Sequence, residues 1–175
     1  MAEDRRDELL QGTVAWVLQH GLGGLSLRPL AAALGTSDRM LVYHFGSKDR
    51  LVDEVLAAAN GLLLAGVTAA ASASPREPAA LLRALWAVAA QDSTAPFVRL
   101  FFEVYGLALQ RPDRYGAALR EVAGAWRQAV LERLDGDERT ATLVVAAVEG
   151  LLLDLLVSGD RARVETALDD LAGRL

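Results

Sequence analysis

Residues Leu25–Leu51 read LSLRPLAAALGTSDRMLVYHFGSKDRL, and this stretch decides the fold of the N-terminal part of the chain. Its first helix has an N-cap candidate at Ser26 and carries Pro29 in its first turn, where a missing backbone N–H costs little. The helix is predicted to end at Leu34, because Gly35 follows it and glycine readily adopts the left-handed conformation that stops a helix.

A second short helix follows the glycine turn. Ser37 or Asp38 can cap its N-terminus, and it runs to about Phe45. Leu41 and Phe45 are spaced i, i+4, so both side chains can reach the same core. Two helices of this size, joined by a turn of about 3–4 residues that contains glycine, form a helix-turn-helix, whose second helix enters the DNA major groove.

The same stretch resembles the DNA-binding domain of the tetracycline-repressor (TetR) family of bacterial regulators. The resemblance is specific because many residues match at fixed spacing. It covers about residues 8–60 and is only architectural beyond them. The matching residues are Ser26, Leu27, Arg28, Leu30, Ala31, Leu34, Gly35, Ser37, Leu41, Tyr43, His44, Phe45, Ser47, Lys48 and Leu51.

The resemblance implies an all-α protein with an N-terminal three-helix helix-turn-helix DNA-binding domain and a C-terminal helical domain for ligand binding and dimerisation. We assign residues 1–50 to the first domain and 51–175 to the second, with a linking helix over about 48–71. Helical periodicity dominates the chain and no stretch convincingly predicts a strand. Further helices are expected at about 3–20, 77–91, 95–110, 113–134, 137–158 and 160–174, which gives about nine in all.

Polar and basic side chains gather around the turn and the second helix, and each type suits a DNA surface. Arg39 can contact a guanine edge or a phosphate, Asp38 can accept from a cytosine amino group, and Lys48 stands at a helix N-terminus that attracts phosphate. The resemblance implies the same assignment. The candidate DNA-binding residues are Arg28, Thr36, Ser37, Asp38, Arg39, Met40, Tyr43, His44 and Lys48.

Two positions depart from the family pattern. The family usually has a small residue at the position of Arg39 and a tyrosine at the position of Val42. Valine cannot donate a hydrogen bond to a phosphate, so either Arg39 compensates or the helix docks differently. We therefore expect unusual base contacts, while DNA binding itself is retained.

The charge distribution predicts a small DNA footprint. The chain has a formal net charge of −5, yet its first fifty residues carry six cations and six anions. The remaining residues, with 12 cations and 17 anions, hold all the excess negative charge. The net charge therefore argues against general adhesion to nucleic acid and favours a specific reader that docks one helix.

Aromatic residues in the second half predict a small-molecule pocket, as the resemblance also implies. Four of them recur along one side of the helix at 95–110, and two tryptophans come from flanking helices. Aromatic walls suit an apolar or aromatic effector better than a charged one, although the same residues can simply form core. The candidate ligand-binding residues are Trp86, Phe97, Phe101, Phe102, Tyr105 and Trp126.

The helices at about 113–134 and 137–158 correspond to those that form a four-helix dimer interface in the family, so a homodimer is expected. Small residues such as Ala146 and Gly150 permit close approach. Glu149 and Asp154 interrupt the apolar helix, and three roles stay open for them: exposure at a helix edge, pairing with arginines across the dimer, or contact with a ligand.

Other functions have little support in the sequence. There is no cysteine and there are two histidines, so no spacing predicts a metal site, a cofactor or a catalytic triad, and we do not expect an enzyme. The N-terminus lacks the features of a signal peptide. The most apolar run, Leu143–Val157, is too short and too charged to span a bilayer. A cytoplasmic protein without a membrane partner is expected.

We interpret the chain as a homodimeric regulator of transcription, most simply a repressor that a small, mainly apolar effector releases from a palindromic operator. An activator remains an alternative. Two other classes also remain: a helical small-molecule-binding protein without DNA binding, and an enzyme on a helical scaffold. Salt-dependent binding to a selected palindrome would separate the regulator from both.

Overall fold

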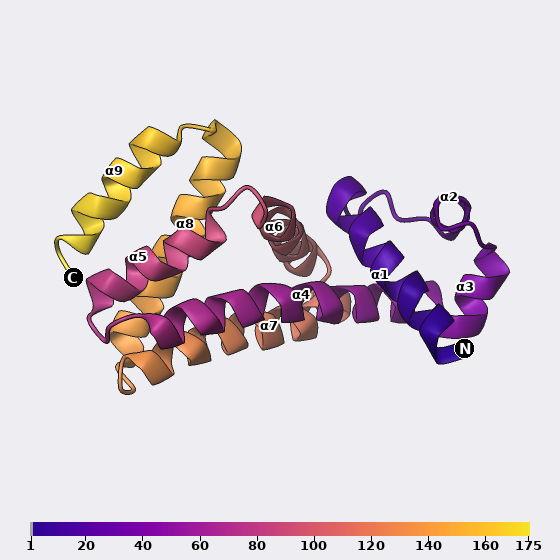
Figure 1. The fold of residues 1–175 in the computed structure, drawn as a ribbon, viewed down its shortest axis with the longest axis horizontal. Helices are drawn as coiled ribbons and strands as arrows, with labels where there is room; N and C mark the ends of the chain where they lie inside the picture. The colour runs from indigo at the N-terminus through magenta and orange to yellow at the C-terminus, as the bar shows by residue number, and fades with distance from the viewer. Residues whose placement is uncertain (1) are drawn as a thin grey trace. The chain divides into compact units, whose positions relative to one another are not determined.

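The computed structural model describes the backbone of residues 2–175 and the side chains from residue 4 onward, and the described chain is helical (Figure 1). Nine helices form two compact units in this part of the chain: unit 1, residues 1–62, and unit 2, residues 63–175. The predicted all-α fold is confirmed. The boundary between the units falls inside the linking helix, twelve residues after the predicted start of the second domain at residue 51.

Unit 1 contains α1 (Ala2–His20), α2 (Leu27–Ala33), α3 (Asp38–Phe45) and the first part of α4 (Lys48–Ala73). Leucine, valine and phenylalanine side chains from all four helices form its core, because each helix has one apolar face. The buried residues include Leu9, Val14, Val17, Leu30, Leu41, Phe45, Leu51 and Val55.

The turn between α2 and α3 has the geometry that the sequence predicts. Gly35 has a φ of +62°, and its N–H donates to the carbonyl of Ala32. The next N–H, of Thr36, donates to the carbonyl of Ala31 over 2.9 Å. This pair of hydrogen bonds is a Schellman motif, which satisfies the last carbonyls of α2 and reverses the chain into α3.

Serine caps start two of these helices. Ser37 Oγ accepts a hydrogen bond from the N–H of Met40, and Ser47 Oγ accepts one from the N–H of Arg50. Ser26 occupies the predicted N-cap position of α2, but its side chain makes no capping hydrogen bond. α3 and α4 are therefore fixed by side-chain caps, whereas the start of α2 depends on packing.

Gly12 lets α1 and the end of α2 approach each other closely. A Cβ atom at this position would lie only 2.6 Å from Leu34 Cδ2. The side chain of Leu34 thus lies over the backbone of α1, and any larger residue at position 12 would have to displace it.

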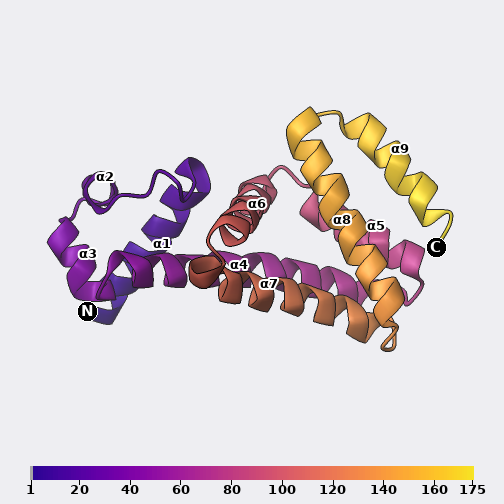
Figure 2. The ribbon, with the colours of Figure 1, turned by 180° about the vertical axis from the view of Figure 1, so that it is seen from behind.

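Unit 2 contains the end of α4 together with α5 (Pro78–Ala89), α6 (Ala95–Gln110), α7 (Pro112–Arg133), α8 (Glu138–Ser158) and α9 (Arg161–Ala172). α8 packs against α5, α6, α7 and α9, and α6 also packs against α7 (Figure 1). A tight turn joins α7 to α8, with Asp135 and Gly136 both at positive φ (Figure 2). α8 is thus the helix around which the core of unit 2 is built.

One face of α8 is buried and the opposite face is apolar but exposed. Ala141, Val144, Val148 and Leu152 face the core, whereas Leu143 is 52% exposed, Leu153 46% and Val157 81%. Exposed apolar area of this kind marks an interaction surface more often than an isolated leucine does.

By length and composition alone, α4 and α8 are apolar enough to cross a membrane. The apolar run Leu143–Val157 is 15 residues long, but it lies within α8, a helix of 21 residues, so shortness does not distinguish this helix from a membrane span. Core helices of soluble proteins, which are mostly buried, pass the same test; here 28% of the α4 window and 22% of the α8 window are buried within the chain.

Candidate nucleic-acid interface and small-molecule site

Most of the predicted DNA-binding residues are exposed on unit 1. In α3, Leu41 and Phe45 are buried, which leaves Arg39 and Tyr43 on the opposite side of the helix. Tyr43 is 77% exposed, and Met40 and Val42, on the flanks of the helix, are each 41% exposed. Of the nine predicted residues only Thr36 and His44 are partly buried; the exposed ones are Arg28, Ser37, Asp38, Arg39, Met40, Tyr43 and Lys48.

Some of these side chains have local structural roles. Ser37 caps α3, and Asp38 Oδ1 accepts from the N–H of Arg39, so both acceptors are engaged within the first turn. The ring of His44 lies edge-on to that of Tyr43, with centroids 5.2 Å apart. Arg39, Tyr43 and Lys48 are therefore better placed than Ser37 and Asp38 to contact DNA through their side chains.

Arg6 positions the end of α3, a role that sequence reasoning missed. Its Nη2 atom lies 2.5 Å from Glu54 Oε2 in α4, and its Nε donates to the carbonyl of His44 over 3.4 Å. Its guanidinium also lies over the ring of Phe45, 5.0 Å from the centroid. One arginine thus joins α1 to both α3 and α4, and no local sequence signal links residues 38 and 48 positions apart.

In unit 2, four of the six predicted ligand-binding residues form one aromatic cluster. Phe101 stacks on Trp126, with centroids 5.5 Å apart and planes at 15°, and it meets Tyr105 edge-on at 4.8 Å. Phe102 contacts both Phe101 and Tyr105. Phe101 and Trp126 are buried, while Phe102 and Tyr105 are partly buried. We call these four residues, Phe101, Phe102, Tyr105 and Trp126, the aromatic cluster.

The other two predicted ligand-binding residues lie apart from the described ring contacts. Trp86 is buried in α5 and borders a surface hollow with Gln91, Asp92, Arg161 and Glu165. Phe97 packs, partly buried, against the hydrophobic core. The sequence grouped these residues by type, but their helical positions direct them to different surroundings.

Two polar groups accompany the aromatic cluster. The Tyr105 hydroxyl donates to the Glu149 carboxylate, with O–O distances of 3.3 and 3.5 Å. Burial raises the pKa of Glu149, and the hydrogen bond from Tyr105 lowers it in part. The indole N–H of Trp126 is buried and finds no acceptor among the described residues. The aromatic cluster therefore adjoins a partly buried acid and contains a free donor, the indole N–H of Trp126.

Glu149 and Asp154, the two acids within the apolar part of α8, have different surroundings. Asp154 makes a bidentate ion pair with Arg163 of α9, at 2.7 and 2.9 Å, and this contact lowers its pKa. Glu149 instead faces Tyr105 of α6. Asp154 thus pairs within its own chain, and Glu149 is the acid that adjoins the aromatic cluster.

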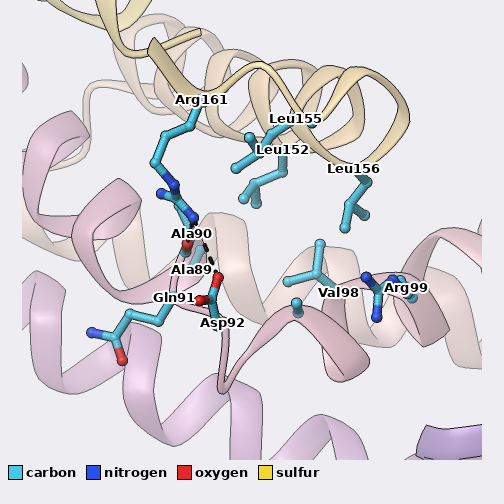
Figure 3. Close-up of a pocket in the computed structure, with 12 residues that line it drawn as sticks. Ala89, Ala90, Gln91, Asp92, Val98, Arg99, Leu152, Leu155, Leu156 and Arg161 are labelled. Atoms are coloured by element: carbon cyan, nitrogen blue, oxygen red, sulfur yellow. Dashed lines mark hydrogen bonds and ion pairs between the residues drawn. The ribbon is translucent and has the colours of Figure 1, made fainter.

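A pocket of about 300 Å³ opens where α5 ends, α6 begins and α8 meets α9 (Figure 3). Val98, Leu152, Leu155 and Leu156 form its apolar wall. On its rim Arg161 donates to the carbonyl of Ala90 over 2.7 Å and lies 3.6 Å from Asp92. None of the predicted ligand-binding residues lines this pocket.

No group of three or more histidine, cysteine or acidic side chains in the described part of the chain is arranged to hold a metal ion. The chemistry available is instead that of binding: an exposed basic and aromatic surface on unit 1, and in unit 2 an aromatic cluster with an adjoining acid, together with a pocket that these residues do not line. A helix-turn-helix unit followed by a helical unit with these features defines a ligand-responsive regulator of transcription.

Comparisons with known proteins agree with this class. Residues 9–55 match the family model of the bacterial regulatory proteins, tetR family. The multidrug binding protein EbrR, solved in complex with proflavin, is 30% identical over 97% of this chain and 98% of its own, with a TM-score of 0.67. The chain belongs to the TetR family, whose members bind operator DNA and small molecules.

Two further proteins are similar over nearly the whole chain. The HTH-type transcriptional regulator BetI of Paraburkholderia phymatum is 26% identical over 180 residues, covering 96% of this chain and 89% of BetI. A transcriptional regulator from Rhodococcus sp. Rha1 has a TM-score of 0.78 at 23% identity, over 97% of this chain and 94% of that one, and shows a shared fold. The protein is a DNA-binding transcriptional regulator that also binds a ligand.

Proposed function

We propose that the protein is a homodimeric repressor, bound to a palindromic operator and released from it by a small, mainly apolar, aromatic effector. The observation that carries the proposal is the surface of α3, where Arg39 and Tyr43 are exposed while Leu41 and Phe45 anchor the helix in the core of unit 1. Residues 1–50 form the DNA-binding domain and residues 51–175 the effector and dimerisation domain.

DNA binding depends on two kinds of contact. Arg39 and Met40, at the start of α3, contact base edges, while Arg28, Tyr43, His44 and Lys48 contact phosphates. Lys48 is the first residue of α4, so the free N–H groups of that helix contribute to the same phosphate site. Thr36, Ser37 and Asp38 hold the turn that presents α3.

The homodimer forms through α7 and α8. Support comes from the exposed apolar face of α8 and from Gly150, where an added Cβ would meet nothing within 4 Å of the same chain. Closely packed helices need such a small residue at their crossing point. Two recognition helices are then presented roughly 34–36 Å apart, one turn of the DNA.

The dimer is tested by Val157→Arg, which places a charge on the most exposed apolar position of α8. The dimer should dissociate at micromolar concentration, because a desolvated, unpaired arginine costs several kcal/mol. Thr142→Arg, on an exposed but polar position near the start of α8, is the matched control. The molar mass from light scattering after size exclusion distinguishes monomer from dimer. If Val157→Arg is still a dimer, α8 is not part of the interface.

The effector binds at the aromatic cluster, and α4 carries its effect to the DNA-binding domain because this helix belongs to both units. The complex of EbrR with proflavin, a flat aromatic molecule, supports an aromatic effector. A coupling of about 1–3 kcal/mol between effector and operator is enough for regulation. We also propose that the protein acts in the cytoplasm, that it has no membrane partner, and that it has no enzymatic activity.

Selection of operator DNA tests the function. Random duplexes bound by the protein should converge on a palindrome with half-sites one helical turn apart, and binding should weaken steeply as salt rises. An aromatic ligand should then release the selected duplex in a mobility-shift assay. If selection yields no palindrome and binding shows no dependence on salt, the protein is a ligand-binding protein without operator function.

A further inference from the structure

The effector site contains a carboxylate whose charge is poorly compensated. Glu149 lies in the middle of α8, between the buried face of the helix and its exposed face. Its hydrogen bond from Tyr105 measures 3.3 Å, longer than the roughly 2.5–2.7 Å usual between a hydroxyl and a carboxylate. Burial is the larger influence on its pKa, and no positive charge contributes to it.

The other two carboxylates of α8 have an arginine each. Glu138 pairs with Arg127, and Asp154 pairs with Arg163. Glu149 is also the most enclosed of the three, since the other two side chains are 64% and 42% exposed. An enclosed acid normally costs more than an exposed one, so leaving it without a cation weakens the fold.

The surroundings of Glu149 suit a positively charged aromatic ligand. Tyr105 contacts both Phe101 and Phe102, and Phe101 continues the stack to Trp126. Ring faces carry negative electrostatic potential, and they attract cations most strongly where water is excluded. A carboxylate beside aromatic rings therefore attracts an organic cation by charge, by cation–π contact and by stacking together.

The pocket of Figure 3 lies along the same two helices as the aromatic cluster, although neither Glu149 nor a residue of the cluster lines it. Leu152 and Leu156, which line the pocket of Figure 3, follow Glu149 by three and seven residues and so share its side of α8. Val98, also in that wall, precedes Phe102 by four residues in α6. The volume of about 300 Å³ is at the lower end of the range for small-molecule sites.

The arginines of this pocket do not oppose a cation strongly. Arg161 is compensated by Asp92 at 3.6 Å, by Glu165 at 3.3 Å and by the carbonyl of Ala90. Arg99 is exposed at the rim, where water and salt screen its charge. Among the three carboxylates of α8, Glu149 is thus the one without an arginine partner.

We propose that the effector is a flat organic cation, bound by the Glu149 carboxylate with Tyr105 and the neighbouring aromatic rings. This inference rests on the proposed function, because it assigns the chemical class of the effector at that site. It also revises the expectation of an uncharged ligand. The cation supplies the positive charge that the protein does not provide.

A matched pair of dyes tests the charge requirement. Proflavin and acridine share one three-ring skeleton, but at pH 7.5 proflavin is a cation and acridine is neutral. Wild-type protein should bind proflavin at least tenfold more tightly than acridine, measured by fluorescence titration. Glu149→Gln should lose at least tenfold in proflavin affinity and keep its affinity for acridine. Glu138→Gln, which removes a carboxylate from an exposed turn of the same helix, should bind both dyes as wild type does.

The outcomes separate this inference from the proposed function. Equal binding of the two dyes, unchanged proflavin affinity in Glu149→Gln, or no measurable proflavin binding by wild type would each overturn it. Operator affinity is measured in parallel on the selected duplex. If the wild-type protein prefers proflavin to acridine but does not bind the operator, the proposed repressor function is wrong and the cation site is retained. If it binds the operator but does not prefer proflavin to acridine, the cation site is wrong and the repressor function is retained.

Discussion

The two units of this protein differ in how their functional residues are held. In unit 1 the recognition helix is fixed largely by neighbours in sequence: Gly35 ends α2, Ser37 caps α3, and Ser47 caps α4. In unit 2 the important contacts join residues far apart, as Tyr105 and Glu149 do. Local signals therefore define the DNA-binding surface, whereas helix packing defines the effector site.

The comparison predicts that substitutions destabilise unit 1 most at buried residues close to the helix ends, such as Phe45. Phe45→Ala removes a buried ring at the end of α3 and the surface under the Arg6 guanidinium, so it should destabilise the protein by about 3–5 kcal/mol. Urea denaturation followed by circular dichroism at 222 nm measures the loss.

Tyr43→Ala is the matched control for this change. It removes an aromatic ring from the same helix at an exposed position, so the free energy of unfolding should change by no more than about 0.5 kcal/mol. Equal destabilisation by the two substitutions would mean that α3 is held by surface contacts and not by its core.

Arg39→Ala tests the exposed side of the same helix. If Arg39 contacts a guanine edge, operator affinity should fall by about 1–3 kcal/mol, or roughly 5- to 150-fold, with discrimination lost mainly at one base pair. The melting temperature and dimer mass should stay as in wild type. A uniform loss across all operator sequences, with a smaller salt dependence, would instead assign Arg39 to a phosphate.

Much of unit 1 could be predicted from the sequence because its signals are short in range. A glycine after a helix and a serine before the next predict the turn, and the spacing of Leu41 and Phe45 predicts which side of α3 is buried. The clamp by Arg6 could not be predicted in this way, since it joins α1 to Glu54 through a pairing that only the folded chain creates.

For unit 2 the sequence predicted the helices and named all four residues of the aromatic cluster, but it did not predict the environment of each residue. The spacing of Phe101 and Tyr105 places both on one side of α6, yet nothing in that spacing distinguishes them from Trp86, which borders a different hollow. Glu149 could be recognised as an unusual acid in an apolar helix. Its partner, 44 residues away, could not.

Gly35→Ala tests how strongly the turn between α2 and α3 depends on glycine. A Cβ atom there would touch nothing within 4 Å, so the whole cost comes from the positive φ of +62° and should be about 1–2 kcal/mol. Gly61→Ala, in the interior of α4 with equal free space and no positive φ, should instead stabilise by up to about 1 kcal/mol. Effects of the same sign at both positions would contradict a conformational role for Gly35.

The smallest expected effect, and the one that distinguishes the units most clearly, is the stability of Glu149→Gln. Burial raises the pKa of this carboxyl in the folded protein, so folding favours its protonated form. The corresponding stability is fully present below the carboxyl pKa of the unfolded chain, about 4.3, and is lost as pH rises through the higher pKa of the folded state. Glu149→Gln removes this loss because its amide stays neutral.

At pH 7.5, then, the Glu149→Gln variant should melt at a higher temperature than wild type, and the two curves should converge near pH 3.5. Glu138→Gln should show no such gain, since its carboxylate is exposed and pairs with Arg127. A lower melting temperature for Glu149→Gln at pH 7.5 would mean that the hydrogen bond from Tyr105 outweighs burial. A higher melting temperature of Glu149→Gln would show that the Glu149 carboxylate destabilises unit 2, as we expect of a residue that serves ligand binding. In unit 1, by contrast, the polar side chains of Ser37 and Ser47 stabilise the helices that they cap.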